Sequence, residues 1–420
     1  MVKRHIKGSK ESAPAFESVL AVLRDRPNAV VLDDPSGRSI VSFTESPLLG
    51  SLGDLQGEIR AEIQPHQGPA NHPFPGGVMG YVSYESGRFF EKMPGPQSPL
   101  PVPEFGLRRY DGSLVHQGGE WSIAGTVEFQ KNAEELLSEA KGVPALTGGL
   151  GCTMQEPPPR EFLNSVERVL EHIAMGDCYQ VNVARRLEFE APESMLGAFL
   201  RLRQRYPSQF GAWLNGGQFS VLSNSPELFL RVRGDVVETA PIKGTRPIIA
   251  NARDSLRDSE KEQAELTMIV DMARNDLARC CVPGSVRAES REILELPTLF
   301  HAQQRVFGML EEGCDAIDAF AACFPPASVT GAPKVKAMEL IHDLEPVPRG
   351  VYTGAIGYFS DGGEACFSVA IRTLMASKNR AWLHVGSGIV ADSDPAQELA
   401  ESGWKAKAFI EALTGLEMVQ

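Results

Sequence analysis

The chain has 420 residues, of which 42% are hydrophobic, and a formal net charge of −13 from 41 Lys and Arg against 54 Asp and Glu. This length and hydrophobic content suffice for a large core and exclude a chain that is mainly disordered. The acidic balance disfavours nucleic acid or an anionic membrane as the main partner. An anionic ligand would therefore need a bound cation, backbone amides or buried Arg and Lys side chains.

The first residues, MVKRHIKGSKESAPAF, contain no apolar stretch as long as a signal peptide, and no later segment has enough consecutive apolar residues to span a bilayer. The seven cysteines are scattered and form no C-x-x-C pair, which favours a reducing compartment over a disulfide framework. We therefore expect a soluble cytoplasmic protein that does not act on a membrane.

The first 150 residues show mainly strand patterns. Short apolar runs at 29–33 (AVVLD) and 76–85 (GGVMGYVSYE) are flanked by turn residues, while residues 16–23 have helical spacing. A segment rich in Pro and Gly then ends in QEPPPR. We therefore divide the chain into an N-terminal β-rich region, residues 1–150, and a second region, residues 155–420.

Helices and strands both recur in the second region. Helical spacing at 160–175 is followed by strand-like runs at 219–232 (FSVLSNSPELFLRV) and 234–244 (GDVVETAPIKG), and then by a long helical pattern at 259–279. This mixture predicts an α+β fold.

Two residues of the strand-like runs are candidates for catalysis. Glu227 precedes the apolar LFL, and a buried glutamate with a raised pKa suits a general acid. Lys243, in PIKGTRP, lies between a strand and a Gly-Thr turn; it could act as a nucleophile if burial or a neighbouring cation lowered its pKa. The alternatives are a hydrogen-bonded structural glutamate and an ordinary exposed lysine.

Two helical patterns each present a Glu-x-x-Glu. The first begins with Ser259 and Glu262 in the spacing of a capping box, and Glu265 lies on the same side as Glu262. Considered alone, Glu262 suits a capping role and Glu265 a solvated position, because acids near a helix N-terminus interact favourably with its dipole.

The last helical pattern repeats the arrangement. Asp394 can cap it, and Glu398, Glu401 and Lys405 fall on one face. Carboxylates from two helices could converge on a hard cation, and Mg²⁺ prefers one or two carboxylates, waters and an anionic substrate. The alternative is two pairs of solvated acids.

Glycines precede this last helix in the segment HVGSGIVADSDP. Because glycine permits close backbone approach, the amides of Gly386, Ser387 and Gly388 could receive a carboxylate. A β-bulge or a turn is the alternative.

Three polar residues, His301, Tyr352 and Arg372, stand isolated in apolar or Gly-rich surroundings. Each alone suits a structural role. Arg372, inside the strand-like run FSVAIRTL, suits it least, because a buried arginine almost always has an anionic partner.

Seven segments of residues 160–420 resemble, in order, those of the chorismate-utilising enzymes, the family of anthranilate synthase and aminodeoxychorismate synthase large subunits, isochorismate synthases and salicylate synthases. The segments are SPELFLRV, PIKGTRP, AELTMIVDMARNDLAR, SVTGAPK, YTGAIGYF, FSVAIRTL and GSGIVADSDPAQELAESGWKAK. HPFPGGVMGYVSYESGR resembles the N-terminal part of the family more loosely. The resemblance implies two antiparallel β-sheets packed face to face with helices outside, and an N-terminal region that adds strands to the same body.

The resemblance also implies roles for the residues named above. Glu265 and Glu401 are expected to bind Mg²⁺, which meets the ring carboxylate of chorismate, with Glu262 and Glu398 in support. Glu227 is expected to protonate the departing C4 hydroxyl. The remaining substrate contacts implied by the resemblance are Gln180, Thr245, His301, Tyr352, Arg372, Gly386, Ser387, Gly388 and Lys405.

Two positions distinguish branches of this family. Members that add water carry a lysine as base where this chain has Gln180, and a glutamine cannot deprotonate water. Anthranilate synthases usually read PIAGT where this chain reads PIKGT, the form usual in aminodeoxychorismate synthases, whose lysine is thought to attack C2 of the ring. The resemblance therefore implies that Lys243 takes part in making 4-amino-4-deoxychorismate, for 4-aminobenzoate and folate synthesis. An anthranilate synthase large subunit and a catalytically idle chorismate-binding subunit are the alternatives.

The nitrogen source is expected to lie outside the chain. No cysteine lies in a nucleophile-elbow context that would indicate a glutamine amidotransferase. Ammonia would then come from solution or from a separate glutamine amidotransferase subunit, which is the family expectation.

Overall fold

The computed structural model describes residues 4–5, 13–50, 54–64, 72–144, 146, 151–296 and 299–415. The start of the chain, on which the expectation about a signal peptide depends, lies largely outside these residues, as does part of the Pro- and Gly-rich segment before residue 155. Among the described residues, no helix combines the length and apolar character needed to cross a membrane.

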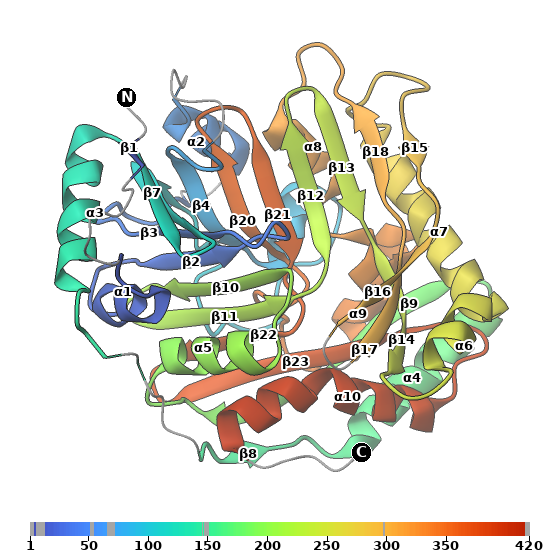
Figure 1. Cartoon of the computed structure of the whole chain (residues 1–420). Helices are drawn as coiled ribbons and strands as arrows, with labels where there is room; N and C mark the ends of the chain where they lie inside the picture. Colours follow the sequence, from blue (N-terminus) through green and yellow to red (C-terminus); the bar gives the residue numbers. More distant parts are fainter. Residues whose placement is uncertain are drawn as a thin grey trace.

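The largest sheet runs through most of the molecule (Figure 1) and is antiparallel at every recorded pairing. Its longest pairing joins β9 and β23, and β10 pairs with β2 from the N-terminal region. In spatial order its strands are β1 (Arg4–His5), β7 (Glu120–Gly125), β6 (Gly112–Gln117), β3 (Ser39–Ser42), β2 (Val30–Asp33), β10 (Phe210–Asn215), β11 (Phe219–Ser225), β22 (Thr373–Ser377), β23 (Arg380–Ile389), β9 (Gln180–Glu190) and β19 (Gly331–Ala332), with β8 (Met154–Gln155) also on β9.

A second antiparallel sheet stands upright in Figure 1, and a third, of three strands, lies beside it. The second sheet contains β15 (Arg287–Ala288), β18 (Val306–Met309), β13 (Val236–Ala240), β12 (Leu228–Arg233), β21 (Ala365–Val369), β20 (Ala355–Ser360), β4 (Gly77–Val82) and β5 (Arg108–Tyr110). The third contains β14 (Ile242–Pro247), β17 (Leu299–Gln303) and β16 (Glu292–Glu295).

The core has an inner layer between the sheets and outer layers under the helices. Val30 and Met375 of the largest sheet and Met79 and Ile356 of the second sheet belong to one buried apolar cluster, so the two sheets pack face to face. Outside the largest sheet lie α1 (Phe16–Leu23), α3 (Val127–Glu139), α5 (Met195–Arg205) and α10 (Pro395–Thr414). Outside the second lie α2 (Leu55–Glu62), α6 (Ala252–Asp258), α7 (Glu260–Leu277) and α8 (Ala316–Cys323).

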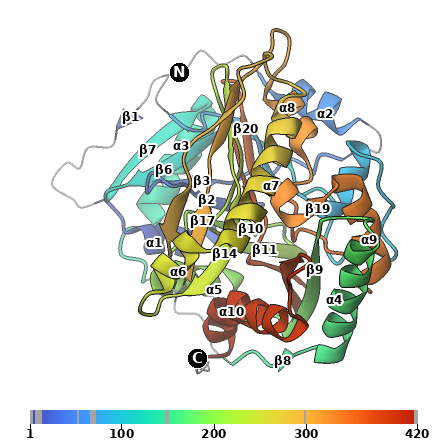
Figure 2. The same ribbon diagram turned by 90° about the vertical axis from the view of Figure 1, so that its right-hand side faces the viewer.

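Two further helices, α4 (Pro159–Ala174) and α9 (Lys334–Leu344), pack beside β9, as Figure 2 shows. The predicted α+β fold with two antiparallel sheets and external helices is thus confirmed. The third sheet was not predicted.

Two prolines explain how the strand-like runs divide between sheets. The run 219–232 breaks at Pro226, where β11 of the largest sheet ends and β12 of the second begins. The run 234–244 breaks at Pro241, and β14 leaves the second sheet to form the third. Because proline has no N–H, it cannot continue a ladder of backbone hydrogen bonds.

Candidate active site

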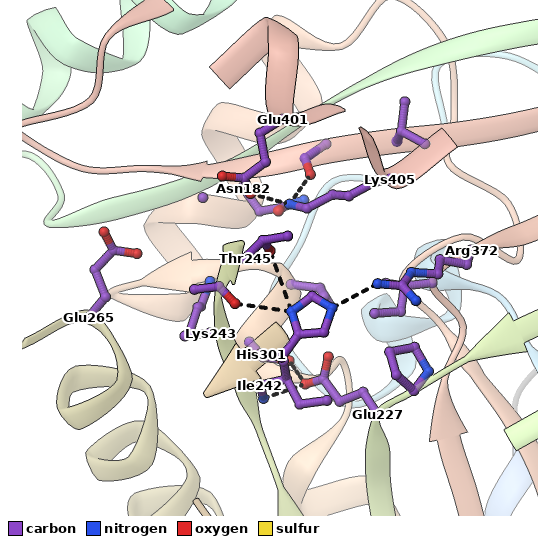
Figure 3. Close-up of a pocket in the computed structure, with 18 of the residues that line it drawn as sticks. Asn182, Glu227, Ile242, Lys243, Thr245, Glu265, His301, Arg372, Glu401 and Lys405 are labelled. Atoms are coloured by element: carbon purple, nitrogen blue, oxygen red, sulfur yellow. Dashed lines mark hydrogen bonds and ion pairs between the residues drawn. The ribbon is translucent and has the colours of Figure 1, made fainter. Parts of the chain in front are cut away.

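A cavity opens where the sheets meet α7 and α10 (Figure 3). Strands β9, β14, β17 and β23 contribute to its wall, together with the β11–β12 turn and the two helices. The residues predicted from the sequence that line it are Glu227, Lys243, Thr245, Glu262, Glu265, His301, Tyr352, Arg372, Gly386, Gly388, Glu398, Glu401 and Lys405. Gln180 and Ser387 are not part of its lining.

Glu227 lies in the short turn between β11 and β12 and is only 3% exposed. Its Oε1 atom accepts hydrogen bonds from the Ser328 hydroxyl and, at 3.4 Å, from the Ile242 amide. Burial raises the pKa of Glu227 to about 7, although Ser328 and Lys243 oppose the shift. A carboxyl group that titrates near neutrality can donate a proton and be reprotonated by solvent.

Lys243 reaches the pocket from β14 beside a bulge. The register of β14 against β17 shifts between Lys243 and Thr245, and the intervening Gly244 has a φ of +73°. A Cβ on Gly244 would approach the Glu262 carboxylate to 2.7 Å, so only glycine fits there. Burial lowers the pKa of Lys243, while the carboxylate of Glu265 opposes this. The lowered pKa increases the fraction of neutral, nucleophilic amine.

His301 is held between β14 and Arg372. Arg372 Nη2 donates to His301 Nε2 at 2.8 Å, so Nδ1 carries the proton and donates to the Gly244 carbonyl at 3.0 Å. Burial, followed by the charge of Arg372, lowers the pKa of His301 to about 3. The ring is therefore a neutral wall of the pocket.

The prediction that Arg372 lies inside a strand is wrong. The run FSVAIRTL is interrupted between β21 and β22, and Arg372 has a φ of +50°. Among the described residues no carboxylate forms an ion pair with it, and its recorded partner is the neutral His301. Burial lowers the pKa of Arg372 to about 10, so it stays charged at neutral pH. The site therefore presents a cation to an anionic ligand.

The four carboxylates of α7 and α10 differ in their partners. Glu262 accepts from Arg246 at 2.9 Å and Glu398 from Ser393 at 2.7 Å. Glu401 pairs with Lys405 at 2.7 Å. Within the described part of the chain, the recorded ion pair of Glu265 is a 4.0 Å contact with Lys261, and burial raises the pKa of Glu265 to about 7.

One expectation about α7 needs correction. The Ser259 hydroxyl caps the helix by accepting from the Glu262 amide at 3.3 Å, as predicted. The Glu262 side chain does not complete a capping box, because its carboxylate is drawn to Arg246 of the third sheet.

The donor set fits Mg²⁺ with few protein ligands. Among the described residues, no group of three or more His, Cys, Asp and Glu side chains lies close enough to hold a metal. Mg²⁺ commonly uses one or two carboxylates and completes its shell with waters and substrate oxygens. Glu265 and Glu401 could supply these carboxylates. Glu265 has its recorded ion-pair contact at 4.0 Å, and Glu401 would exchange its ion pair with Lys405 for the metal, whereas Glu262 and Glu398 are hydrogen-bonded to Arg246 and Ser393.

The glycines predicted to receive a carboxylate lie inside β23, not in a turn. Gly388 faces Lys243: a Cβ there would lie 2.7 Å from Gln180 Nε2 and 3.0 Å from Lys243 Nζ. Ser387 points to the opposite face, as strand alternation requires, and its hydroxyl donates to the Glu398 carbonyl at 3.5 Å. Gln180 is fully buried on the same face of β9 as Asn182, next to Gly388.

The sequence analysis did not single out several residues of the site. Asn182 and His384 line the cavity from β9 and β23, and Ser328 contacts Glu227. Arg349 is fully buried and donates to the carbonyl groups of Asn182 and Val329, which ties two wall segments together. Ser328 lies within the SVTGAPK motif, which was the available signal for it.

Comparison with known proteins agrees with the geometry. A family model described as chorismate binding enzyme matches residues 28–411. The chain is 34% identical over 415 residues to anthranilate synthase component 1 of Streptomyces coelicolor, covering 90% of this chain and 81% of that protein. It is 35% identical over 364 residues to aminodeoxychorismate synthase component 1 of Klebsiella aerogenes, covering 84% of this chain and 80% of that protein.

Solved structures give the same picture. The crystal structure of anthranilate synthase component I from Streptococcus pneumoniae matches with a TM-score of 0.78 at 26% identity, covering 97% of this chain and 94% of that one. The menaquinone-specific isochorismate synthase of Escherichia coli also has a TM-score of 0.78, at 20% identity, which supports the fold alone.

Proposed function

Because the chain belongs to the chorismate binding enzyme family, we propose that it converts chorismate and ammonia to 4-amino-4-deoxychorismate. The observation that carries this proposal is Lys243, which lines the pocket together with Glu227 and has a lowered pKa. A neutral amine and a protonated carboxyl group are the two groups that substitution of a ring hydroxyl requires.

The proposed reaction has two substitutions. Glu227 protonates the C4 hydroxyl, which leaves as water while Nζ of Lys243 bonds to C2 and the two ring double bonds shift. Ammonia then bonds to C4 as the C2–Nζ bond breaks and the double bonds shift back, which restores the lysine. The new ammonium group returns a proton to the Glu227 carboxylate. Arg372 and Lys405, which line the same pocket, supply positive charge for the substrate carboxylates.

Mg²⁺ would be held by Glu265 and Glu401 and would neutralise the ring carboxylate of chorismate. Lys405 lines the same pocket and pairs with Glu401 at 2.7 Å, so this carboxylate also balances the charge of the lysine. A bound cation and positive side chains in the same pocket suit a dianionic substrate in a chain whose net charge is −13.

The proposed context is folate synthesis, through 4-aminobenzoate, with ammonia supplied by a glutamine amidotransferase subunit. All seven cysteines are free, which supports placing the reaction in the reducing cytoplasm.

Product identification tests the proposal. Purified protein, chorismate, Mg²⁺ and ammonium are incubated and the product is analysed by mass spectrometry, with and without an added lyase for aminodeoxychorismate. We expect aminodeoxychorismate, and 4-aminobenzoate only with the lyase. Anthranilate formed without the lyase would instead support the second candidate, anthranilate synthase component I, since the chain is about as similar to the Streptomyces coelicolor protein of that name, at 34% identity, as to the Klebsiella aerogenes aminodeoxychorismate synthase component 1, at 35%.

Lys243→Ala tests the covalent step. We expect no lysine adduct of the substrate in the variant and a large loss of turnover, whereas the unchanged chain should form a trappable adduct. Full turnover by Lys243→Ala would exclude the covalent route. Tight chorismate binding with no turnover by the unchanged chain would point to the idle binding subunit.

A further inference from the structure

A second cavity, of about 590 Å³, lies beside the candidate active site. We call it the outer cavity. It borders the middle of β9, between its pairings with β19 and β8, where no strand among the described residues continues the sheet. There the Ala184 amide donates to Glu345 at 2.9 Å. Its wall includes Glu161 of α4 and Arg186 of β9. His384 lines both the outer cavity and the active-site pocket.

One face of the β9–β23 pair leads from one cavity to the other. Asn182, Ala184 and Arg186 alternate onto the same face of β9. Gly386 stands opposite Ala184 and His384 opposite Arg186. Asn182 lines the inner pocket, whereas Ala184 and Arg186 line the outer cavity. The boundary between the cavities therefore falls at Ala184 and His384.

His384 has an unusual environment for a polar side chain. It is 2% exposed, and neither ring nitrogen has a hydrogen-bond partner among the described residues. Its ring stacks on Tyr352 with centroids 5.4 Å apart. A buried polar group without a partner is costly, so it indicates that a small polar molecule visits the ring. Burial, and then Arg186, lowers the pKa of His384 well below its usual value, which leaves one donor and one acceptor nitrogen.

The outer cavity differs from the inner pocket in charge. Its ionised side chains are the carboxylates of Glu156, Glu161, Glu188 and Glu345 and the guanidinium groups of Arg185 and Arg186. Both guanidinium groups are already paired, Arg185 with Glu156 and Arg186 with Glu188, so the described lining of the outer cavity presents no free cation to a dianion. The inner pocket offers Arg372 and Lys405 to the anionic substrate.

We propose that the outer cavity is the entrance for ammonia and that the His384 ring is the gate between this entrance and the substrate. The inference rests on the proposed function, in which ammonia must reach a pocket already occupied by chorismate. Ammonium loses its proton to solvent, and the neutral ammonia enters the outer cavity. Neutral ammonia then passes the ring by exchanging hydrogen bonds with its two nitrogens, and no covalent bond changes.

Ala184→Leu tests the entrance, because the larger side chain fills the space between the two cavities. Ala184→Ser is its control, because serine has nearly the same volume as alanine. Initial rates are measured against ammonium at saturating chorismate, and the chorismate dissociation constant is measured directly. We expect the apparent KM for ammonia to rise at least about tenfold in Ala184→Leu while chorismate affinity stays within about twofold. The serine variant should match the unchanged chain.

A second pair of variants avoids the core. Asn164 is exposed on α4 and lines the outer cavity, so Asn164→Trp narrows the cavity without disturbing packing, and Asn164→Ala is its control. We expect Asn164→Trp to raise the apparent KM for ammonia and Asn164→Ala to leave it unchanged. If Ala184→Leu and Asn164→Trp both fold and both keep the apparent KM for ammonia of the unchanged chain, the outer cavity is not the entrance for ammonia. An unchanged chain that makes no aminated product would refute the proposed function, and the entrance with it.

Discussion

Glu227 shows how one buried carboxyl group can set a pH profile. Because burial raises its pKa to about 7, the protonated acid predominates below that pH and is lost as the pH rises through it. At a fixed concentration of free ammonia we expect the rate to fall above about pH 7, and Glu227→Gln to lower the rate by about 10²–10⁴-fold and to abolish this limb. Rate measurements from about pH 6 to about 9 check this; a flat profile for the unchanged chain would contradict it.

For single residues, the sequence indicated most of the pocket lining. It missed residues whose role depends on partners far away in the sequence. Glu227, Lys243 and His301 stood out because their surroundings are apolar or rich in glycine. Asn182 carried no such signal, since an asparagine within a strand shows its direction only when the neighbouring strand is known. Glu262 suited a local cap equally well, and only the fold brings Arg246 within 2.9 Å of it.

Strand β23 brings Gly388 against Lys243, and this closeness can be tested. In Gly388→Ala the new methyl group would lie 3.0 Å from Lys243 Nζ and 2.7 Å from Gln180 Nε2. We expect turnover to fall at least about tenfold, because the methyl group displaces the Lys243 amine and a small misplacement of a reacting group is costly. Steady-state kinetics with a thermal melt separate this effect from unfolding.

Gly403→Ala is the matched control for this substitution. A Cβ at Gly403, on α10, meets nothing within 4 Å. We expect unchanged kinetics and a gain in stability of about 0.5–1 kcal/mol, because alanine favours a helix interior over glycine. Equal kinetic losses in both variants would contradict the assigned role of Gly388.

Helices α7 and α10 together define the proposed metal site. If Glu265 and Glu401 hold Mg²⁺ with the substrate, Mg²⁺ and chorismate added together should raise the melting temperature. Ligands at about 100 times their dissociation constant stabilise by about 2.7 kcal/mol. Glu265→Gln and Glu401→Gln should each reduce this shift. Glu260→Gln, exposed in the first turn of α7, should retain it; an equal shift in all variants would exclude the site.

The elements themselves were largely predictable, and their grouping into sheets was less so. Residues 16–23 form α1 as predicted, and the helical pattern at 160–175 corresponds to α4. Periodicity treated 219–232 and 234–244 as single strands because it does not reveal which neighbour a strand will pair with. The prolines at 226 and 241 marked the breaks, yet only the fold shows that the chain changes sheets there.

For the whole molecule, the division at residue 155 remains a prediction about sequence regions. In the structure β2 pairs with β10, and β4 pairs with β20, so both large sheets join strands from either side of that position. We expect residues 155–420 expressed alone to lack a cooperative unfolding transition, because β10 and β20 lose their partners.

Co-expression of residues 1–150 with residues 155–420 is the matched test. We expect the two pieces to associate and restore a cooperative transition, because the paired strands can reassemble. Circular dichroism with urea denaturation would detect both results. A second region that unfolds cooperatively alone would contradict the shared-sheet architecture.

The pairing of β9 with β23 also has a kinetic consequence. Asn182 lies opposite Gly388, so two walls of the pocket come from segments about two hundred residues apart in the sequence, and closing such a loop costs entropy before any contact repays it. Folding rates fall as contacts become more distant in sequence. The catalytic pocket is therefore expected to form late in folding, after the hairpins β6–β7, β10–β11 and β12–β13 that close over short loops.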